Sequence, residues 1–493
     1  MILLLLVLAA VWWWGARRHD YWRRRRVPYE WPLPFVGTEA RVFLARRSVS
    51  QAASDVYWRH PTQRYVGTYR GNKPQLVVRD PDLAYQLLVA DFNSFHSRGL
   101  HPCEDSVEPL LRNLFFAEGE LWRALRRRLA PAFTIARLKA MFPLVAAVAE
   151  RLAVRASDAA GRARPLDVRD LMARYNTDVI ASCGFGIEAD CLDDDNSAFK
   201  KLGRKIYRMT PQRCLTILLK CVFPRVFKSF KFLGQELEDE VVSLVRAIIK
   251  ERNNEPSDRN DFVDLMLRLA RHPREGEITV DDELVAAQCF VFFAAGFETS
   301  TTATSFTLHQ LAHHPRAQDK AQKEVDSVLQ KYGGKLCYEA VNEMTYLEWT
   351  LMEALRMFPP GLLLRKCTRR YTLPGTDVTL DSGVKILIPL EAIHNDPQYF
   401  EEPHEFMPER FRPARVAARN KRAYLPFGAG PRYCIGARLG MMQSLVGLAA
   451  VLSRSSVRPA PGAPRVLGAH PTSTVVQNLA GPVPLLLHKR GDV

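Results

Sequence analysis

The stretch LPFGAGPRYCIGARLGMMQ, residues 425–443, places a single cysteine among glycines. Three glycines and an arginine surround Cys434: Gly428, Gly430, Gly436 and Arg432. A zinc site needs several ligands at short spacings, and this stretch offers no second Cys and no His. A lone cysteine before a helix is more often a buried thiol than a functional one. The rest of the pattern decides whether Cys434 is a buried thiol or a functional cysteine.

The residues after Cys434 form an apolar helical pattern, GARLGMMQSLVGLAAVLS, so we expect its sulfur near a helix N-terminus. Backbone N–H groups and the helix dipole stabilise a thiolate at that position. Gly428 and Gly430 permit a tight turn with positive φ, and Gly436 lets the backbone approach a flat group. Arg432 is placed to neutralise an anion beside that group. The full spacing F-x-x-G-x-R-x-C-x-G is far more specific than the cysteine alone.

This spacing resembles the haem-binding loop of the cytochrome P-450 superfamily, the haem-thiolate monooxygenases. The resemblance implies that Cys434 is the axial ligand of the iron in haem b, with Phe427 shielding its sulfur. It implies that Arg432 pairs with a haem propionate, and that Gly428 and Gly436 belong to the cofactor-binding loop. It also implies the fold class, which is mainly α with a small β-rich lobe, in a single domain that holds the haem between two helices.

A second motif, ExxR, lies in TLMEALRMFPP, where Glu353 and Arg356 share one helical face. Such i,i+3 pairs are usually solvated surface bridges. The apolar residues around this pair favour burial, and a buried pair needs further partners. The resemblance supplies one in FMPERF, whose Arg410 joins the ExxR pair in the superfamily. We therefore expect Glu353, Arg356 and Arg410 to form a structural lock behind the haem, without a catalytic role.

A third motif, AGFET, comes at the end of the apolar run 284–297 and closes with Glu298 and Thr299. A helix that is apolar on nearly all faces is buried, and an acid there is costly unless it is satisfied or functional. In the inert interpretation, the Thr299 hydroxyl donates to the Ala295 carbonyl. In the functional one, which the resemblance favours, the helix opens locally at Gly296 and makes room for dioxygen. Thr299 with ordered water then delivers protons, and Glu298 feeds the relay.

Four more residues are expected around the haem propionates. Trp122 and Arg126 lie four residues apart on one helical face, and in the superfamily such a W-x-x-x-R pair holds a propionate. The ordinary alternative is a basic surface helix. Arg98 in FHSRGL and Arg365 in LLLRKC stand where the superfamily has further propionate partners.

The resemblance also implies an apolar substrate pocket beside the haem. Its expected lining is Phe115, Phe116, Phe293, Ala295, Phe297, Leu363, Leu364, Val475 and Val476. Each of these residues is more often part of a core than of a pocket wall. The motifs DFNSFHSRGL and HNDPQYFEEPHEFMPERF look most like the insect microsomal family linked to xenobiotic metabolism. The expected substrates are small hydrophobic molecules, either xenobiotics or endogenous lipids and hormones.

The chain has 493 residues and a net charge of +16, and arginines cluster after an uncharged N-terminal run, MILLLLVLAAVWWWGA. This order predicts a membrane anchor with its basic flank on the cytoplasmic side, whereas a cleaved signal peptide carries its charge before the apolar run. We expect an anchor at 1–18, a basic and Pro-rich connector at 19–37, and a haem-binding catalytic domain at 38–493. The resemblance implies the endoplasmic reticulum membrane. No nucleic-acid-binding motif accompanies the charge.

The sequence has no G-x-G-x-x-G after a strand, so we expect NADPH to bind a separate flavoprotein reductase, with cytochrome b5 as a second candidate electron donor. Basic residues near the thiolate face are the expected docking surface: Arg127, Arg128, Lys421, Arg422 and Arg438. Two other functions stay open, a haem-thiolate isomerase or dehydratase that acts on a peroxide and a non-catalytic haem sensor. The intact Glu298–Thr299 pair favours oxygen activation.

Outside these motifs the sequence predicts a helix-dominated body with short strands. Helices are expected at 121–129, 138–155, 234–250, 284–312, 319–330 and 345–357. Strands are expected at 75–78, 385–389 and 482–487, and a polar loop at 251–260.

Overall fold

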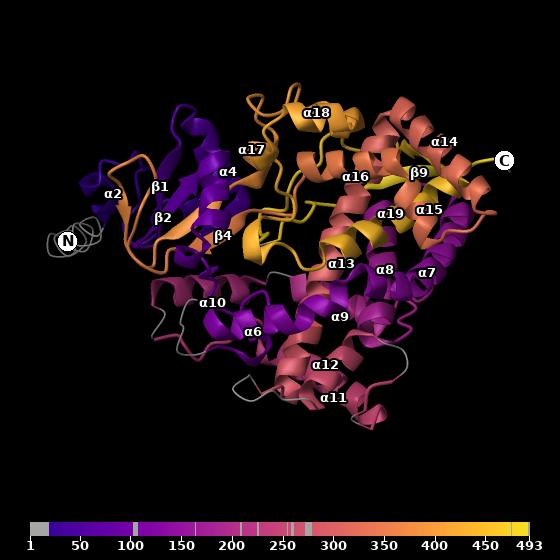
Figure 1. The fold of residues 1–493 in the computed structure, drawn as a ribbon, viewed down its shortest axis with the longest axis horizontal. Helices are drawn as coiled ribbons and strands as arrows, with labels where there is room; N and C mark the ends of the chain where they lie inside the picture. The colour runs from indigo at the N-terminus through magenta and orange to yellow at the C-terminus, as the bar shows by residue number, and fades with distance from the viewer. Residues whose placement is uncertain are drawn as a thin grey trace, which may run out of the picture.

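The computed structural model describes residues 19–491, apart from 102–106, 163, 208–209, 224–225, 254, 258–260, 272–278 and 475. The expected anchor at 1–18 and Val475 of the expected substrate pocket therefore lie outside the described residues. In the part that is described, a large helical region adjoins a smaller region that contains the main sheet (Figure 1). The expected class, mainly α with a small β-rich lobe, is confirmed for these residues.

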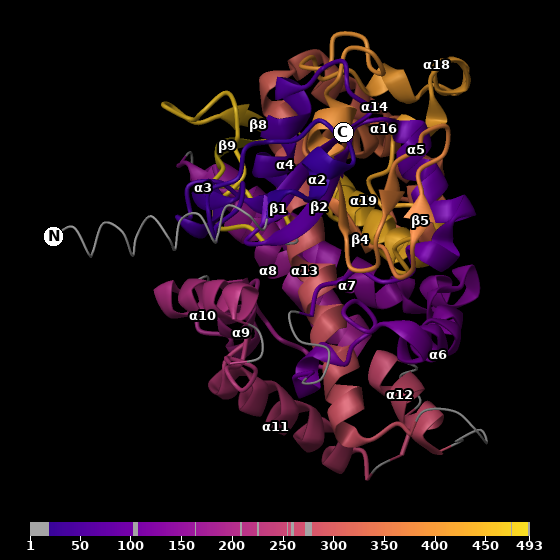
Figure 2. The same ribbon diagram turned by 90° about the vertical axis from the view of Figure 1, so that its left-hand side faces the viewer.

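Helix α13 (Asp282–His313) runs through the middle of the helical region (Figures 1 and 2). Its 32 residues give an axis of about 48 Å, and most of them are buried because the helix is apolar on nearly all faces. Asp281 caps the helix by accepting the Leu284 N–H at 2.7 Å. By length and hydropathy α13 resembles a membrane span, but 67% of its most apolar window is buried inside the protein. We therefore interpret it as a core helix.

Other long helices pack around α13, and all six predicted helices are confirmed. Those in contact with it include α8 (Val168–Ile180), α11 (Gln235–Glu251), α12 (Phe262–Arg271), α16 (Thr345–Met357) and α19 (Ala437–Arg454). The other α-helices in the described part of the chain are α2 (Tyr21–Arg24), α3 (Ala40–Phe43), α4 (Val49–Arg59), α5 (Pro81–Tyr85), α6 (Gly119–Leu129), α7 (Ile135–Gly161), α9 (Ala198–Tyr207), α10 (Pro211–Val222), α14 (Pro315–Lys331), α15 (Tyr338–Glu343), α17 (Leu390–His394) and α18 (Pro413–Ala418). The polar loop was predicted to start at residue 251, but in the structure it starts one residue later because Glu251 still belongs to α11.

Four strands form the main sheet in the order β1–β2–β7–β4. The β2–β7 pair is parallel, whereas β1–β2 and β4–β7 are antiparallel. One smaller sheet has the order β3–β9–β8, and another contains β5 and β6. The three predicted strands are confirmed as β2, β7 and β9. The bounds are β1 (Tyr65–Arg70), β2 (Lys73–Val78), β3 (Leu166–Asp167), β4 (Leu363–Lys366), β5 (Tyr371–Thr372), β6 (Thr379–Leu380), β7 (Lys385–Ile388), β8 (Ser455–Pro459) and β9 (Pro484–Lys489).

The described residues at 19–37, where we expect a connector, pack onto β1. Trp22 in α2 is fully buried, and its indole N–H donates to the Thr68 carbonyl at 2.9 Å. A Cβ on Gly67 would lie 2.5 Å from the Trp22 ring, so this contact requires glycine there. Because arginines surround Trp22 in the sequence, its pattern carries no signal of this burial.

Candidate functional site

The loop before α19 is held in one conformation by its glycines. Gly428 and Gly430 have φ of +76° and +72°, a region that L side chains rarely adopt. Gly430 also has no room for a side chain, because a Cβ would lie 2.1 Å from the Leu88 carbonyl oxygen. The Cys434 N–H donates to the Phe427 carbonyl at 3.0 Å. The expected tight turn before the helix is therefore present, and it fixes the cysteine three residues ahead of α19.

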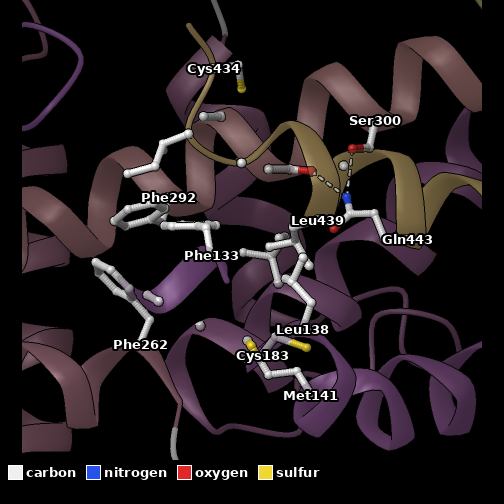
Figure 3. A pocket seen from close by; sticks show the side chains of 18 of the residues that line it. Phe133, Leu138, Met141, Cys183, Phe262, Phe292, Ser300, Cys434, Leu439 and Gln443 are labelled. Carbon is white, nitrogen blue, oxygen red and sulfur yellow. Dashed lines mark hydrogen bonds between the residues drawn. The ribbon is translucent and has the colours of Figure 1, made fainter. Parts of the chain in front are cut away.

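Cys434 lines a cavity of about 1470 Å³, part of which is open to solvent (Figure 3). By surface area this cysteine is exposed, yet burial raises the pKa of its thiol. The two observations agree because the exposed area faces the cavity inside the protein. The Gly436 N–H and the cations Arg126 and Arg98 act in the opposite direction and lower the pKa. A metal ion at the sulfur would complete the stabilisation of a thiolate.

The cavity lies between α13 and the loop that leads into α19. Phe427 and Gly436 line it on the loop side. A Cβ on Gly436 would meet the Phe133 ring at an ordinary contact distance of 3.8 Å, so the described residues leave space beside this glycine. One face of α13 contributes Phe292, Ala295, Gly296, Thr299, Ser300 and Ala303. The resemblance to the superfamily implies a location of this kind, between two helices, for the haem.

Arg432 is buried, and one of its hydrogen-bond donors has no partner among the described residues. It is 4% exposed, and its guanidinium lies 4.3 Å above the Trp122 ring. Its Nε donates to the His96 carbonyl at 2.6 Å and its Nη2 to the Ala117 carbonyl at 2.8 Å. Its Nη1 has no hydrogen-bond partner among the described residues. Burial and neighbouring arginines lower the pKa of Arg432 to about 8, so the site favours an anionic ligand.

Three further arginines complete a cationic cluster around Arg432, in which Arg365 is buried and Arg98 and Arg126 are half-buried. Burial lowers the pKa of Arg98 to about 10 and that of Arg365 to about 9, and it also lowers the pKa of Arg126. Glu118 opposes this shift at Arg98 and Arg432. The Arg365 Nε likewise lacks a hydrogen-bond partner among the residues described. Arg432 and Arg365 are buried cations that each have an unused donor, which fits a ligand that carries carboxylates, such as the propionates of haem b.

The acid and the hydroxyl of the AGFET motif have different surroundings. Thr299 lines the cavity, and its hydroxyl donates to the Ala295 carbonyl at 2.6 Å. Glu298 is 4% exposed, and its Oε1 accepts from Arg169 Nη2 at 3.0 Å. Burial raises the pKa of Glu298, while Arg169 lowers it. The structure shows α13 continuous through Gly296, without the local opening that we expected there.

Gln443 of α19 is a site residue that was not expected from the sequence motifs. Its side-chain amide donates to the Gly296 carbonyl at 2.9 Å and to Ser300 Oγ at 2.7 Å (Figure 3). On the other side, a Cβ on Gly296 would lie 2.5 Å from Ile180, so the helix is tightly packed at this point. These contacts explain the continuous helix. A single amide inside the apolar run GMMQSLVGL was the available signal.

Glu353, Arg356 and Arg410 lie together in the core. Arg356 donates to the Glu353 carboxylate through Nε at 2.8 Å and Nη2 at 2.9 Å, and Arg410 Nε donates to it at 3.1 Å. The most exposed of the three residues is Arg410, at 6%. Arg356 also donates to the carbonyls of His394 at 2.8 Å and Pro403 at 2.7 Å. The cluster therefore ties α16 to the segment that follows α17.

Ala295 is the one member of the expected substrate pocket that lines this cavity among the described residues. Phe293 and Phe297 lie on another face of α13, where they stack with their ring centroids 5.9 Å apart. They are 1% and 7% exposed, so here they belong to the apolar core. The other described members are half-buried and lie off the cavity: Phe115, Phe116, Leu363, Leu364 and Val476.

The fold and the site together define a mainly helical protein with a cysteine at an apolar cavity and a cluster of arginines nearby. Comparison with known proteins identifies the family, because the Cytochrome P450 family model matches residues 28–479. Cytochrome P450 6B7 from Helicoverpa armigera is 34% identical over 471 residues, which cover 92% of each chain. Probable cytochrome P450 6a14 and cytochrome P450 6a2 from Drosophila melanogaster are 37% and 36% identical and cover 88% and 89% of both chains.

This chain belongs to the cytochrome P450 family and is similar to insect members of it. It is therefore an oxidoreductase, a haem monooxygenase that uses dioxygen and electrons from a separate reductase. The residues present fit that cofactor, since the cysteine faces the cavity and buried arginines offer unused donors beside it.

Proposed function

We propose that this chain is a membrane-anchored monooxygenase that inserts one oxygen atom from dioxygen into small hydrophobic substrates. The supporting observation is that Cys434 lines a largely apolar cavity and lies near a cluster of four arginines, whose charge Glu118 offsets in part. Haem b bound in this cavity would supply an iron centre, ligated by the Cys434 thiolate, at which dioxygen is activated. Electrons would come from NADPH through a flavoprotein reductase, with cytochrome b5 as a second candidate donor.

The buried arginines would bind the two propionates and so fix the orientation of the cofactor. Arg432 would use its unpartnered Nη1 for this contact, and Arg365 its unpartnered Nε. Arg98 and Arg126 are close enough to Cys434 for their charges to lower the pKa of its thiol. These two cations would therefore stabilise the Cys434 thiolate as well as bind the propionates. Trp122 would support Arg432 from below the guanidinium plane.

Thr299 and Glu298 would hold and move protons beside the cavity. Because the Thr299 hydroxyl proton is engaged by the Ala295 carbonyl, its oxygen lone pairs remain available to accept a hydrogen bond from water. Glu298 faces Arg169 and does not line the cavity, so its carboxyl would have to turn to pass a proton inward. Burial raises the pKa of Glu298, which makes the acid easier to protonate between transfers.

The substrate class follows from the lining of the cavity and from the similarity to insect relatives. The walls are mainly aliphatic and aromatic, so an apolar molecule gains by leaving water, whereas a highly charged one does not. We propose xenobiotics or endogenous lipids and hormones as substrates. The structural role proposed for Glu353, Arg356 and Arg410 is to hold α16 behind this site.

The N-terminal run at 1–18 would anchor the protein in the endoplasmic reticulum membrane, with the packed segment at 19–37 and the catalytic domain at 38–493 on the cytosolic face. Basic side chains would then dock the reductase. Arg127, Lys421, Arg422 and Arg438 are exposed, and Arg128 is half-buried. Arg422 pairs with Asp82 at 3.0 Å, so the charge that it offers is partly neutralised.

The function can be tested by reconstituting the full chain in lipid vesicles with a flavoprotein reductase and NADPH. The probes would be fatty acids and alkyl aromatic compounds under isotopically labelled dioxygen. We expect one labelled oxygen atom per product, and product only when reductase and NADPH are both present. Product formed from an organic hydroperoxide without reductase would indicate an isomerase or dehydratase instead. Haem binding with no turnover of any probe would favour a sensor.

A further inference from the structure

The cavity at Cys434 continues well beyond the residues that would hold the haem. Its far part lies between the start of α7, α12 and the segment 181–185, and it is lined by Phe133, Leu138, Met141, Cys183, Phe262 and Phe292 (Figure 3). We call this part the apolar arm. Its outermost lining residues are Pro131, Arg137 and Arg268, all of them exposed, so the arm reaches the protein surface there.

The apolar arm leads to the side of α13 that carries Thr299. The α13 residues in the cavity lining recur at intervals of three and four, from Phe292 to Ala303. This spacing is that of a single helical face, and it extends for about 16 Å along the helix axis. Phe292 therefore lies on the same face as Thr299, two turns before it. Phe293 and Phe297, expected at the substrate pocket, belong to a different face.

Three aromatic rings narrow the apolar arm. The ring centroids of Phe133 and Phe292 are 5.4 Å apart, and those of Phe262 and Phe292 are 3.8 Å apart. Rings at these distances are in direct contact, so an organic substrate would have to displace them. A diatomic molecule needs far smaller gaps, which ordinary side-chain motion supplies. The charged members of the lining are Arg137 and Arg268, which are exposed, and Asp261 and Asp264, whose carboxylates pair with Arg252 at 2.8 and 2.6 Å. The apolar walls between them suit small apolar guests.

We propose that the apolar arm is the route by which dioxygen reaches the cofactor cavity from the surface between α7 and α12. The inference rests on the proposed function, in which dioxygen is used beside Thr299. Dioxygen is small and apolar, so it partitions into a narrow aromatic passage whose contacting rings exclude larger substrates. Supply of dioxygen is then separated from entry of the organic substrate.

The test places a large side chain in the apolar arm of the haem-loaded full chain. Met141→Trp fills the arm, and Leu144→Trp is the matched control, since Leu144 is also half-buried on α7 but does not line the cavity. For Met141→Trp we expect a several-fold higher KM for dioxygen and slower rebinding of carbon monoxide after flash photolysis. The substrate Kd, measured from the spectral shift on binding, should equal that of the control.

Xenon provides a readout that does not depend on turnover. Crystals of the parent holoenzyme under xenon pressure should show xenon beside Phe262 and Phe292, and Met141→Trp should remove it. An unchanged KM for dioxygen in folded Met141→Trp would overturn the proposal, as would an arm without xenon. A higher substrate Kd with an unchanged KM for dioxygen would assign the arm to substrate instead. The carbon monoxide spectrum of each variant shows whether the cofactor is bound, so failure of the route can be distinguished from failure of the site.

Discussion

Glu353 is the carboxylate that two buried arginines share. It accepts three side-chain hydrogen bonds from Arg356 and Arg410, and a fourth from the Met407 N–H at 3.0 Å. Removing one member of a buried ionic cluster leaves the others without compensation, which costs about 3–5 kcal/mol. The cluster therefore stabilises the fold chiefly while all three of its side chains are present.

We expect Glu353→Gln to lose most of this stability, because the neutral amide leaves both guanidinium groups buried without a counter-charge. Denaturant unfolding of the purified variant measures this loss of stability, and its haem content should fall in parallel. Glu348→Gln is the control, since Glu348 lies exposed on the same helix. Equal stability of the two variants would contradict the structural role that we assign to Glu353.

At the residue scale, the sequence predicted those parts of the site whose chemistry depends on local spacing. Cys434 and its glycines come together because the turn is encoded within ten residues, and the Glu353–Arg356 contact because i,i+3 residues share a helical face. The lining of the substrate pocket could not be predicted in this way. Whether Phe293 faces a cavity or the core depends on the rotation of α13 against its neighbours, and periodicity does not report this for a helix that is apolar all round.

At the element scale, α13 and α8 are joined by the Glu298–Arg169 ion pair at 3.0 Å. Arg169 also donates to the Leu479 carbonyl at 2.9 Å, so it ties the C-terminal segment to the same point. Because Arg169 lowers the raised pKa of Glu298, its removal should raise that pKa further. The folded state then binds a proton more tightly than the unfolded state, whose Glu titrates near its ordinary pKa.

We therefore expect Arg169→Met to lose stability as pH rises from about 4.5 through the raised pKa of Glu298, and to change little above it. The midpoint of thermal unfolding, recorded between pH 5 and 8, measures this slope. The double variant with Glu298→Gln should lack the additional slope, because it has no acid to ionise. If the single and double variants showed the same pH dependence, Glu298 would not be the group responsible.

The elements also show what periodicity can and cannot predict. α16 begins and ends at the predicted residues, because its apolar face is clear and Phe358-Pro-Pro follows it. α8 was missed because buried polar residues interrupt its pattern, among them Asn176 and Asp178. Their partners come from distant segments, as when Asp178 accepts the Cys191 N–H at 2.7 Å. Burial of Trp22 was missed because arginines surround it in the sequence, and because its partner Thr68 also comes from a distant segment.

At the scale of the whole molecule, the net charge of +16 fits a protein that meets an acidic partner or a membrane surface. We expect Arg127→Glu with Arg438→Glu to raise the KM for the reductase at low salt, because charge steering is lost. The difference from the parent should shrink at high salt, where exposed charges are screened. Arg458→Glu on β8 is the control for a change of charge elsewhere. Identical low-salt kinetics in all three proteins would contradict the proposal that Arg127 and Arg438 help to dock the reductase.

The most direct test of the central claim is the carbon monoxide difference spectrum of the reduced, membrane-bound protein. It would be recorded for the parent, for Cys434→Ala and for Cys337→Ala, a free cysteine outside the cavity lining. We predict a strongly red-shifted Soret band in the parent and in Cys337→Ala, and its loss in Cys434→Ala. A band that persists in Cys434→Ala, or its absence from folded parent protein supplied with haem, would contradict an iron–thiolate bond at Cys434.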